Sequence, residues 1–277
     1  MGVRRMGNQS VLIVGHGSIG KVHAGNARTL GAFVATMDIG DSPDRFMDPY
    51  QFRHEIIATP IDCHMESLNM VVRHFINVYW ILIEKPLTNT LSGVRHIEDT
   101  PVCFIGFSWR FNNVIKQIKH NIEAGTLGDI QYAQLTAREW VPKIADNAWL
   151  ESGSHILDTA RFLFGELEFL YGRKFNGFAS AMLRSLGGGY WIDIHVNCCS
   201  ADPRYDYRIL IQGSKKTGIW QLDRNEPMHL REMKAFLGDK QGLATLQDGI
   251  ENMKLLGAHA SLLRRLTPPE KEQKWNS

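Results

Sequence analysis

The stretch of sequence that decides the fold reads Val11-Leu12-Ile13-Val14-Gly15-His16-Gly17-Ser18-Ile19-Gly20. It opens with an apolar run rich in β-branched residues, which predicts a buried strand. The Gly-x-Gly-x-x-Gly pattern that follows at once is typical of a dinucleotide-binding turn between a strand and a helix. In such a turn Gly15 permits the tight bend, Gly17 lets the backbone approach a pyrophosphate, and Gly20 lets the helix pack on the strand.

The residues after the glycines fit the same unit. A helix is predicted up to Leu30-Gly31, and its first residues, Ser18 and Ile19, would offer free backbone N–H groups and a positive dipole end to phosphates. A second strand is predicted over Ala32–Met37 and ends at Asp38. The Asp38 carboxylate can accept a hydrogen bond from a ribose 2′-hydroxyl and would repel a 2′-phosphate, which favours NAD over NADP. A glycine triplet alone could also be an ordinary turn.

Composition sets broad limits on the function. The 277 residues suit one long or two ordinary domains, and 44% hydrophobic with 22% charged residues is typical of a soluble globular protein. A net charge of +2 does not indicate a nucleic-acid or membrane partner. The first apolar run stops at Gly15, too early for a signal peptide, so we expect a cytoplasmic protein. Four cysteines lack metal-ligand spacing, so no metal site is predicted: Cys63, Cys103, Cys198 and Cys199.

The first part of the chain alternates strands with helices. Further strands are predicted at Glu55–Ala58, Val78–Ile83 and Val102–Gly106, and helices at His64–Phe75 and Ser92–Glu98. The polar segment Asp41–Gln51, with two prolines, is predicted as a loop. It leaves little room for the helix and strand that a full doubly wound half would place there, so that unit is reduced or the sheet is small.

After Gly106 the pattern changes to a run of strands with a few helices, so we place a domain boundary there: residues 1–106 and 107–277. Helices are predicted at Asn112–Ala124 and Trp149–Phe164, and two more, from Pro227 and from Leu243, close the chain. The strands are predicted at Ile130–Glu139, Leu167–Tyr171, Ala179–Leu183, Tyr190–Cys198, Tyr205–Ile211 and Gly218–Leu222.

One of these strands alternates strictly, with apolar residues on one face and Trp191, Asp193, His195 and Asn197 on the other. No helix is predicted to cover the polar face. We expect it to meet another subunit or to line the substrate pocket, which favours a homodimer or homotetramer.

Polar residues follow two of the buried strands, as Thr59-Pro60 and Glu84-Lys85-Pro86. Because ligands bind at the carboxyl edge of a parallel sheet, Lys85 is expected beside the nicotinamide. There it could relay a proton or, as a cation, polarise a substrate oxygen. The alternative is a loop lysine neutralised by its neighbour Glu84.

A second group of polar residues is spaced for a helix. Glu151, His155 and Asp158 are four and three residues apart, which puts them on one helical face. Two carboxylates beside an imidazole would raise its basicity and fix its tautomer, as a general base requires. An ordinary solvated ion-pair face is the alternative.

A third group lies where the two parts of the chain meet. In the segment Phe107–Asn112, Trp109 could stack on a ligand and Arg110 could clamp the substrate or the cofactor. A hinge whose aromatic residues pack into the interdomain core is an equally good interpretation.

Together these stretches resemble the Gfo/Idh/MocA oxidoreductases, the glucose–fructose oxidoreductase and inositol dehydrogenase group. The resemblance runs from about residue 11 to residue 166. It is carried by Gly15-His16-Gly17-Ser18-Ile19-Gly20-Lys21-Val22-His23, Ala58-Thr59-Pro60 with His64, Glu84-Lys85-Pro86, Arg110-Phe111-Asn112, Gly153-Ser154-His155-Ile156-Leu157-Asp158 and Phe164-Gly165-Glu166.

The resemblance implies an α/β fold: a Rossmann domain with a doubly wound parallel sheet, then an α+β domain with a mainly antiparallel sheet. It implies NAD(P)-dependent hydride transfer between a nicotinamide cofactor and a hydroxyl-bearing carbon of a sugar, cyclitol or nucleotide sugar. Lys85 and His155 correspond to the family's catalytic residues, and Glu151 to its helix aspartate. The cofactor site would include Thr59, Pro60, His64 and Glu84, and the substrate site Lys85, Trp109, Arg110, His155 and Asp158.

Some residues depart from the family pattern. Glu151 has one methylene more than the aspartate, Ser108 stands where many members have asparagine, and Asn113 where proline is common. The chain is also short for the family. These departures keep a second interpretation open, a non-catalytic dinucleotide-binding regulatory or scaffold protein on the same fold.

Overall fold

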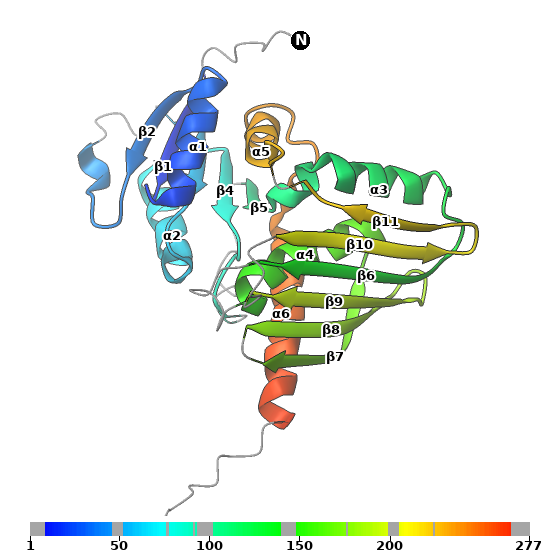
Figure 1. The fold of residues 1–277 in the computed structure, drawn as a ribbon. Coiled ribbons are helices and arrows are strands. Elements are labelled where there is room, and N and C mark those ends of the chain that lie inside the picture. The colour runs from blue at the N-terminus through cyan, green and yellow to red at the C-terminus, as the bar shows by residue number, and fades with distance from the viewer. Residues whose placement is uncertain are drawn as a thin grey trace, which may run out of the picture.

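The computed structural model describes residues 9–45, 52–75, 78–90, 92, 102–139, 148–175, 177–198, 205–223 and 225–266. They form two six-stranded sheets, each covered by helices (Figure 1). Among the described residues no helix is both long and apolar enough to cross a bilayer.

The first sheet has the strand order β12-β5-β4-β3-β1-β2, and its first five strands along the chain are parallel. Helices α1 and α5 cover one face, and helices α2 and α6 pack on the other. The strands are β1 (Ser10–Val14), β2 (Phe33–Met37), β3 (His54–Ile57), β4 (Trp80–Glu84), β5 (Val102–Gly106) and β12 (Ala244–Thr245). The helices are α1 (Ser18–Thr29), α2 (His64–His74), α5 (Met228–Leu237) and α6 (Leu246–Leu266).

The second sheet has the order β11-β10-β6-β9-β8-β7 and is antiparallel except for the pair β6–β9. Helices α4 (Ala148–Phe164) and α6 pack against one face, while α3 (Asn113–Glu123) packs on α4. The strands are β6 (Ile130–Arg138), β7 (Leu167–Phe175), β8 (Phe178–Ser185), β9 (Trp191–Asn197), β10 (Asp206–Gly213) and β11 (Thr217–Gln221). The predicted fold class, a doubly wound parallel sheet plus a mainly antiparallel one, is confirmed.

Two features were not predicted. The two-residue strand β12 pairs with β5, although it comes from the end of the chain, and α5 packs on α1 of the first sheet. The end of the chain therefore contributes to both halves of the molecule, since α6 contacts β5 in the first sheet and β7 in the second, whereas the sequence suggests a single boundary near Gly106. Between β2 and β3 the described residues contain only a short 3-10 turn, Pro43–Arg45. The helix predicted at Ser92–Glu98 falls outside the described residues, apart from Ser92.

Candidate active site

The chain leaves β1 for β2 on one side and later returns to form β3 on the other side, so the loops after β1 and β3 diverge. Such a point, at the carboxyl edge of a parallel sheet, is where ligands bind. Gly15 has φ +95° and donates its N–H to the Met37 carbonyl at 2.9 Å. A Cβ on Gly20 would lie 2.0 Å from the Gly15 carbonyl oxygen, but one on Gly17 would meet nothing within 4 Å. Gly15 and Gly20 thus shape the turn, and open space remains beside Gly17.

Helix α1 starts at this opening. Its N-terminus has no side-chain cap and its first turn has no acidic residue, so the N–H groups near Ser18 and Ile19 and the positive dipole end are available to an anion. Asp38 follows β2 at the same edge and is exposed. Gly17, the first turn of α1 and Asp38 therefore lie at one edge of the first sheet.

The residues after β3 differ in exposure. Pro60 is exposed at the sheet edge, and the Thr59 hydroxyl lies 3.3 Å from that of Ser67. His64 is buried, with ring nitrogens 3.0 Å from the Thr59 carbonyl and 3.3 Å from the Leu87 carbonyl. Burial lowers the pKa of His64 despite these hydrogen bonds. His64 therefore connects the segment after β3 to the segment after β4. Its ring is buried, so this position differs from the cofactor contact that the resemblance implies.

Glu84 is also buried. Its Oε1 lies 2.6 Å from Nε2 of His23, and its Oε2 accepts the N–H of Lys85 at 3.2 Å. Burial alone would raise the pKa of Glu84, but the hydrogen bond and charge of His23 outweigh it and hold the pKa below its ordinary value. The Glu84 carboxylate thus holds the backbone of Lys85. Its buried position against His23 differs from the cofactor contact that the resemblance implies.

Lys85 extends from the end of β4 into a cavity of about 370 Å³ between the two sheets. There its Nζ donates to Oε2 of Glu151 at 3.1 Å and to the Glu151 carbonyl at 3.4 Å. Glu151 lies in the first turn of α4, and His155, one turn later, lines the same cavity together with Trp109. The fold therefore brings three segments that are far apart in the sequence to one cavity: the end of β4 with Lys85, the segment after β5 with Trp109, and α4 with Glu151 and His155.

The surroundings of His155 differ from those predicted. Its ring lies flat on Trp109, with centroids 5.1 Å apart and planes at 2°, and its Nδ1 is buried without a hydrogen-bond partner among the described residues. Burial, aided by the charges of Lys85 and His229, holds the pKa of His155 well below its ordinary value. The prediction of raised basicity is wrong, because Glu151 turns to Lys85 and Asp158 turns away from the cavity.

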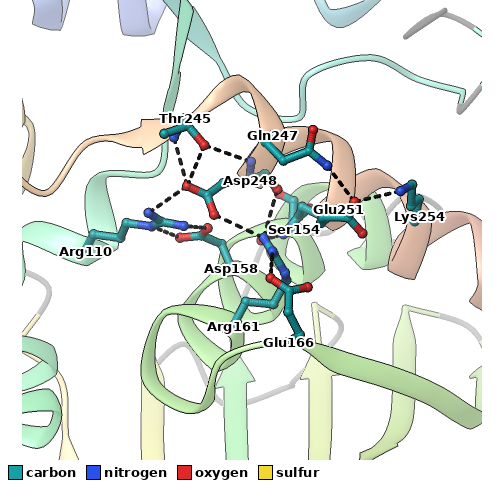
Figure 2. Close-up of polar contacts among 11 residues, drawn as sticks. Arg110, Ser154, Asp158, Arg161, Glu166, Thr245, Gln247, Asp248, Glu251 and Lys254 are labelled. Carbon is teal, nitrogen blue, oxygen red and sulfur yellow. Dashed lines mark hydrogen bonds and ion pairs between the residues drawn. The ribbon is translucent and has the colours of Figure 1, made fainter. Parts of the chain in front are cut away.

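Asp158 instead pairs with Arg110 in the interior (Figure 2). Arg110 donates to both carboxylate oxygens, at 2.9 and 2.6 Å, and Asp158 has no exposed surface. Burial raises the pKa of Asp158 even though Arg110 opposes it. Neither residue lines the cavity, so the expected substrate contacts of Arg110 and Asp158 do not fit their placement.

The same network holds the start of α6 (Figure 2). Asp248 accepts from Arg110 at 3.2 Å and from Arg161 at 3.3 Å. It also accepts the N–H of Thr245 at 2.9 Å, while the Thr245 hydroxyl accepts the N–H of Asp248 at 3.2 Å, which is a capping box. Arg110 thus joins the segment after β5, helix α4 and helix α6.

Sequence reasoning missed His229, which lines the cavity from the start of α5, and the buried Glu232 one turn later. No pattern in the sequence singles out either residue, because α5 also carries the charged residues Arg231 and Lys234. In the part of the chain that the structure describes, no group of three His, Cys, Asp or Glu residues could hold a metal ion.

Comparison with known proteins assigns the chain to a family. A model for the C-terminal alpha/beta domain of the Gfo/Idh/MocA oxidoreductase family matches residues 119–266, more than half of the chain. The chain belongs to the Gfo/Idh/MocA oxidoreductase family. This confirms the resemblance carried by the motifs.

Two sequence relatives of this family member are inositol dehydrogenases. The myo-inositol 2-dehydrogenase of Thermotoga maritima is 27% identical over 184 residues, 56% of this chain and 54% of the relative. The NAD(+) scyllo-inositol 2-dehydrogenase of Bacillus subtilis is 30% identical over 135 residues, 43% of this chain and 39% of the relative. The chain thus matches about half, or less, of the length of these curated relatives.

Two solved structures of oxidoreductases share the fold over almost the whole chain. The WlbA dehydrogenase of Bordetella pertussis, in complex with NADH and UDP-GlcNAcA, has a TM-score of 0.76 at 18% identity and covers 95% of this chain and 99% of that one. The scyllo-inositol dehydrogenase of Lactobacillus casei, with NAD(H) and scyllo-inositol bound, has a TM-score of 0.74 at 16% identity and covers 93% and 97%. At these identities the likeness concerns the fold.

Proposed function

We propose that the chain is an NAD-dependent dehydrogenase that transfers a hydride between the nicotinamide and a hydroxyl-bearing carbon of a cyclitol, sugar or nucleotide sugar. One observation carries the proposal. Lys85 from the first sheet and His155 from helix α4 face one cavity, at the sheet edge that holds the glycine turn. The relatives that act on inositols and bind NAD(H) support the same reaction class.

The residues of this chain fit NAD. Open space beside Gly17, the uncapped start of α1 and the exposed Asp38 would hold the pyrophosphate and a ribose hydroxyl. The bound cofactor supplies the hydride acceptor. Thr59 and Pro60 would border it after β3.

Lys85 and Glu151 would act on the substrate oxygen as a pair. Glu151 holds the Lys85 ammonium in the cavity, where it can donate a hydrogen bond to the hydroxyl that is oxidised. His155 is half-buried, its lowered pKa keeps it neutral, and with Nδ1 enclosed it would use Nε2 to accept from the same hydroxyl. Trp109 fixes the plane of the imidazole. The two groups would thus converge on one oxygen, as loss of a proton and a hydride from one carbinol requires.

We also propose that the chain forms a homodimer or homotetramer through the face of the second sheet opposite α4 and α6. Strand β9 buries Ile192, Ile194 and Val196 on the helix side, and its other face presents Trp191, which is 50% exposed. Partly exposed Tyr171, Met182 and Ile219 share that outer face. An exposed surface on which aromatic and apolar side chains lie among polar ones is typical of a subunit interface.

The direct test is an assay of NADH formation by the purified chain with myo-inositol, scyllo-inositol, free sugars and nucleotide sugars. We expect turnover of at least one of them with NAD. If NAD binds and no compound of these classes is turned over, the non-catalytic regulatory or scaffold function replaces the enzyme proposal.

A further inference from the structure

We propose that a second hollow beside the cavity holds an uncharged sugar ring, so that the substrate is a glycoside whose other ring is oxidised in the cavity. This inference rests on the proposed dehydrogenase function and narrows its substrate class. The hollow measures about 900 Å³ and shares the side chains of Tyr207, Leu222 and Asp223 with the cavity. A group attached to the reacting ring therefore reaches the hollow across these three side chains.

The hollow lies at one end of the second sheet, where β6 and β11 end and β10 begins. Figure 1 shows that this end of the sheet points towards the first sheet. The cavity of about 370 Å³ would hold the nicotinamide and one ring of the substrate. Ligand sites measure about 300–1,000 Å³, so the hollow is large enough to be a site of its own. A substrate with a second ring would extend from the cavity into this space.

A row of aromatic rings connects the cavity with the hollow. The His155 ring stacks on Trp109, and the Trp109 ring meets Tyr207 edge-on, with centroids 4.7 Å apart. Tyr207 lies beside Tyr205, with centroids 6.4 Å apart and planes at 30°. Tyr205 is 37% exposed and lines the hollow. The C–H groups on one face of a sugar ring carry a small positive charge and pack against the electron-rich face of an aromatic ring, so Tyr205 offers the second ring a surface to lie on.

The polar side chains of the hollow include both donors and acceptors of hydrogen bonds. Nη2 of Arg138 and Nη2 of Arg208 donate to the same atom, Oδ2 of Asp206, at 3.1 and 3.2 Å. Each guanidinium has five N–H groups and uses one of them in this contact. The amides of Gln221 and Asn225 add further donors and acceptors. Because a sugar hydroxyl also both donates and accepts, a ring with several hydroxyls matches this mixed lining.

The charges of the hollow favour an uncharged ring over a nucleotide. Arg138 and Arg208 are balanced by the carboxylates of Asp206 and Asp223, so the formal charges of the described lining sum to zero. Glu139, in the adjoining wall of the cavity, adds a further negative charge. The diphosphate of a nucleotide sugar is negatively charged and only accepts hydrogen bonds, so Asp223 and Glu139 would repel it. A glycosyl ring carries no charge and meets no such repulsion.

The first test compares ligands on the NAD-bound protein by calorimetry and saturation-transfer NMR. The matched sets are glucose with maltose and cellobiose, and myo-inositol with its α-galactoside, while UDP-glucose is the charged alternative. We expect at least one glycoside to bind about tenfold or more tightly than its single ring, which corresponds to about 1.4 kcal/mol of added contact. Saturation should reach both of its rings. Glycosides that bind no more tightly than the single rings, or UDP-glucose that binds more tightly than every glycoside, would overturn the proposal.

Variants of Tyr205 test whether the second ring lies in the hollow. Tyr205→Ala should weaken glycoside binding by about three- to tenfold, the effect of one aromatic contact, and leave binding of the single ring unchanged. Tyr205→Phe keeps the aromatic ring and should retain most of the affinity. Tyr79→Ala, at an exposed tyrosine just before β4 and thus at the other end of that strand from Lys85, is the matched control and should change neither affinity. Glycoside binding that Tyr205→Ala leaves intact, or an equal loss for the single ring, would contradict the proposal.

Turnover separates this inference from the function on which it rests. Where NADH forms, kcat/KM should be higher for the glycoside than for its single ring, and Tyr205→Ala should lower it for the glycoside alone. Equal kcat/KM values for the ring and its glycoside would remove the second-ring site and leave the dehydrogenase function in place. Tight binding of glycosides without NADH formation would count against the dehydrogenase function and leave the hollow as a glycoside-binding site.

Discussion

The rings of Trp109 and His155 stack at the wall of the cavity, with their centroids 5.1 Å apart and their planes nearly parallel. Their neighbours explain why this stack is fixed. Arg110, next to Trp109, forms a two-bond ion pair with Asp158, one helical turn after His155. Two adjacent contacts thus join the segment after β5 to helix α4, one buried and ionic, the other aromatic and open to the cavity. We infer that Arg110 and Asp158 position His155.

Breaking this ion pair should damage stability and the site together. Asp158→Asn leaves the Arg110 guanidinium buried with half of its carboxylate partners, and loss of one member of a buried pair costs about 3–5 kcal/mol. We expect a lower urea midpoint with an unchanged slope. Glu123→Gln, which removes an exposed pair with Lys119, is the control and should cost less than about 1 kcal/mol. Equal midpoints for the two variants would contradict a stabilising role of the Arg110–Asp158 pair.

The groups that face the substrate should affect turnover more than cofactor affinity. Lys85→Ala and His155→Ala would each remove a contact that we propose to the reacting oxygen, so we expect kcat to fall by about 10²- to 10⁴-fold. NAD affinity, measured by protein fluorescence, should stay within a few-fold. Glu151→Gln should cost less, because Glu151 holds Lys85 and does not itself move the proton. Near-full turnover in both alanine variants would refute the mechanism.

Alanine substitutions at three glycines should distinguish an effect on cofactor binding from an effect on stability. A Cβ at Gly17 meets open space, so Gly17→Ala should keep its stability and lose NAD affinity by filling the place of the pyrophosphate. Gly20→Ala should unfold more easily, because its Cβ would lie 2.0 Å from the Gly15 oxygen. Gly25→Ala, also in open space on α1, is the control and should gain up to about 1 kcal/mol from helix propensity. Thermal melts with and without NAD distinguish the three, and unchanged NAD affinity in Gly17→Ala would place the cofactor elsewhere.

Local sequence patterns predict the fold well, but they do not predict which side chains from distant parts of the chain contact each other. The apolar run before Gly15 predicts a buried strand, and the alternation around Ile194 predicts a strand with one buried face. Both are confirmed. The carboxylates of α4 were placed on one helical face, but their partners come from elsewhere in the chain. Asp158 binds Arg110, 48 residues away, and Glu151 binds Lys85, 66 residues away. Because spacing along one helix does not reveal such partners, the basicity of His155 was predicted with the wrong sign.

The choice between NAD and NADP should depend on Asp38. Its exposed carboxylate follows β2 at the cofactor edge and would repel a 2′-phosphate. We expect tighter binding of NAD than NADP by the wild type, and Asp38→Ser should reduce or reverse the difference. Fluorescence titrations with both cofactors measure it. Tighter binding of NADP by the wild type would remove Asp38 from the cofactor site.

The outer face of the second sheet should hold subunits together. Trp191, 50% exposed on β9, lies opposite the side that α4 and α6 cover, so a charge there would be buried in a dimer and would be costly. Light scattering of the wild type at tens of micromolar should give at least twice the chain mass of 31.4 kDa, and Trp191→Glu should shift it towards one chain. Val72→Glu, on the outer side of α2, changes an apolar residue of similar exposure away from this face and should leave the mass unchanged. A monomeric wild type would exclude this interface, and a Trp191→Glu oligomer of unchanged mass would move it to another surface.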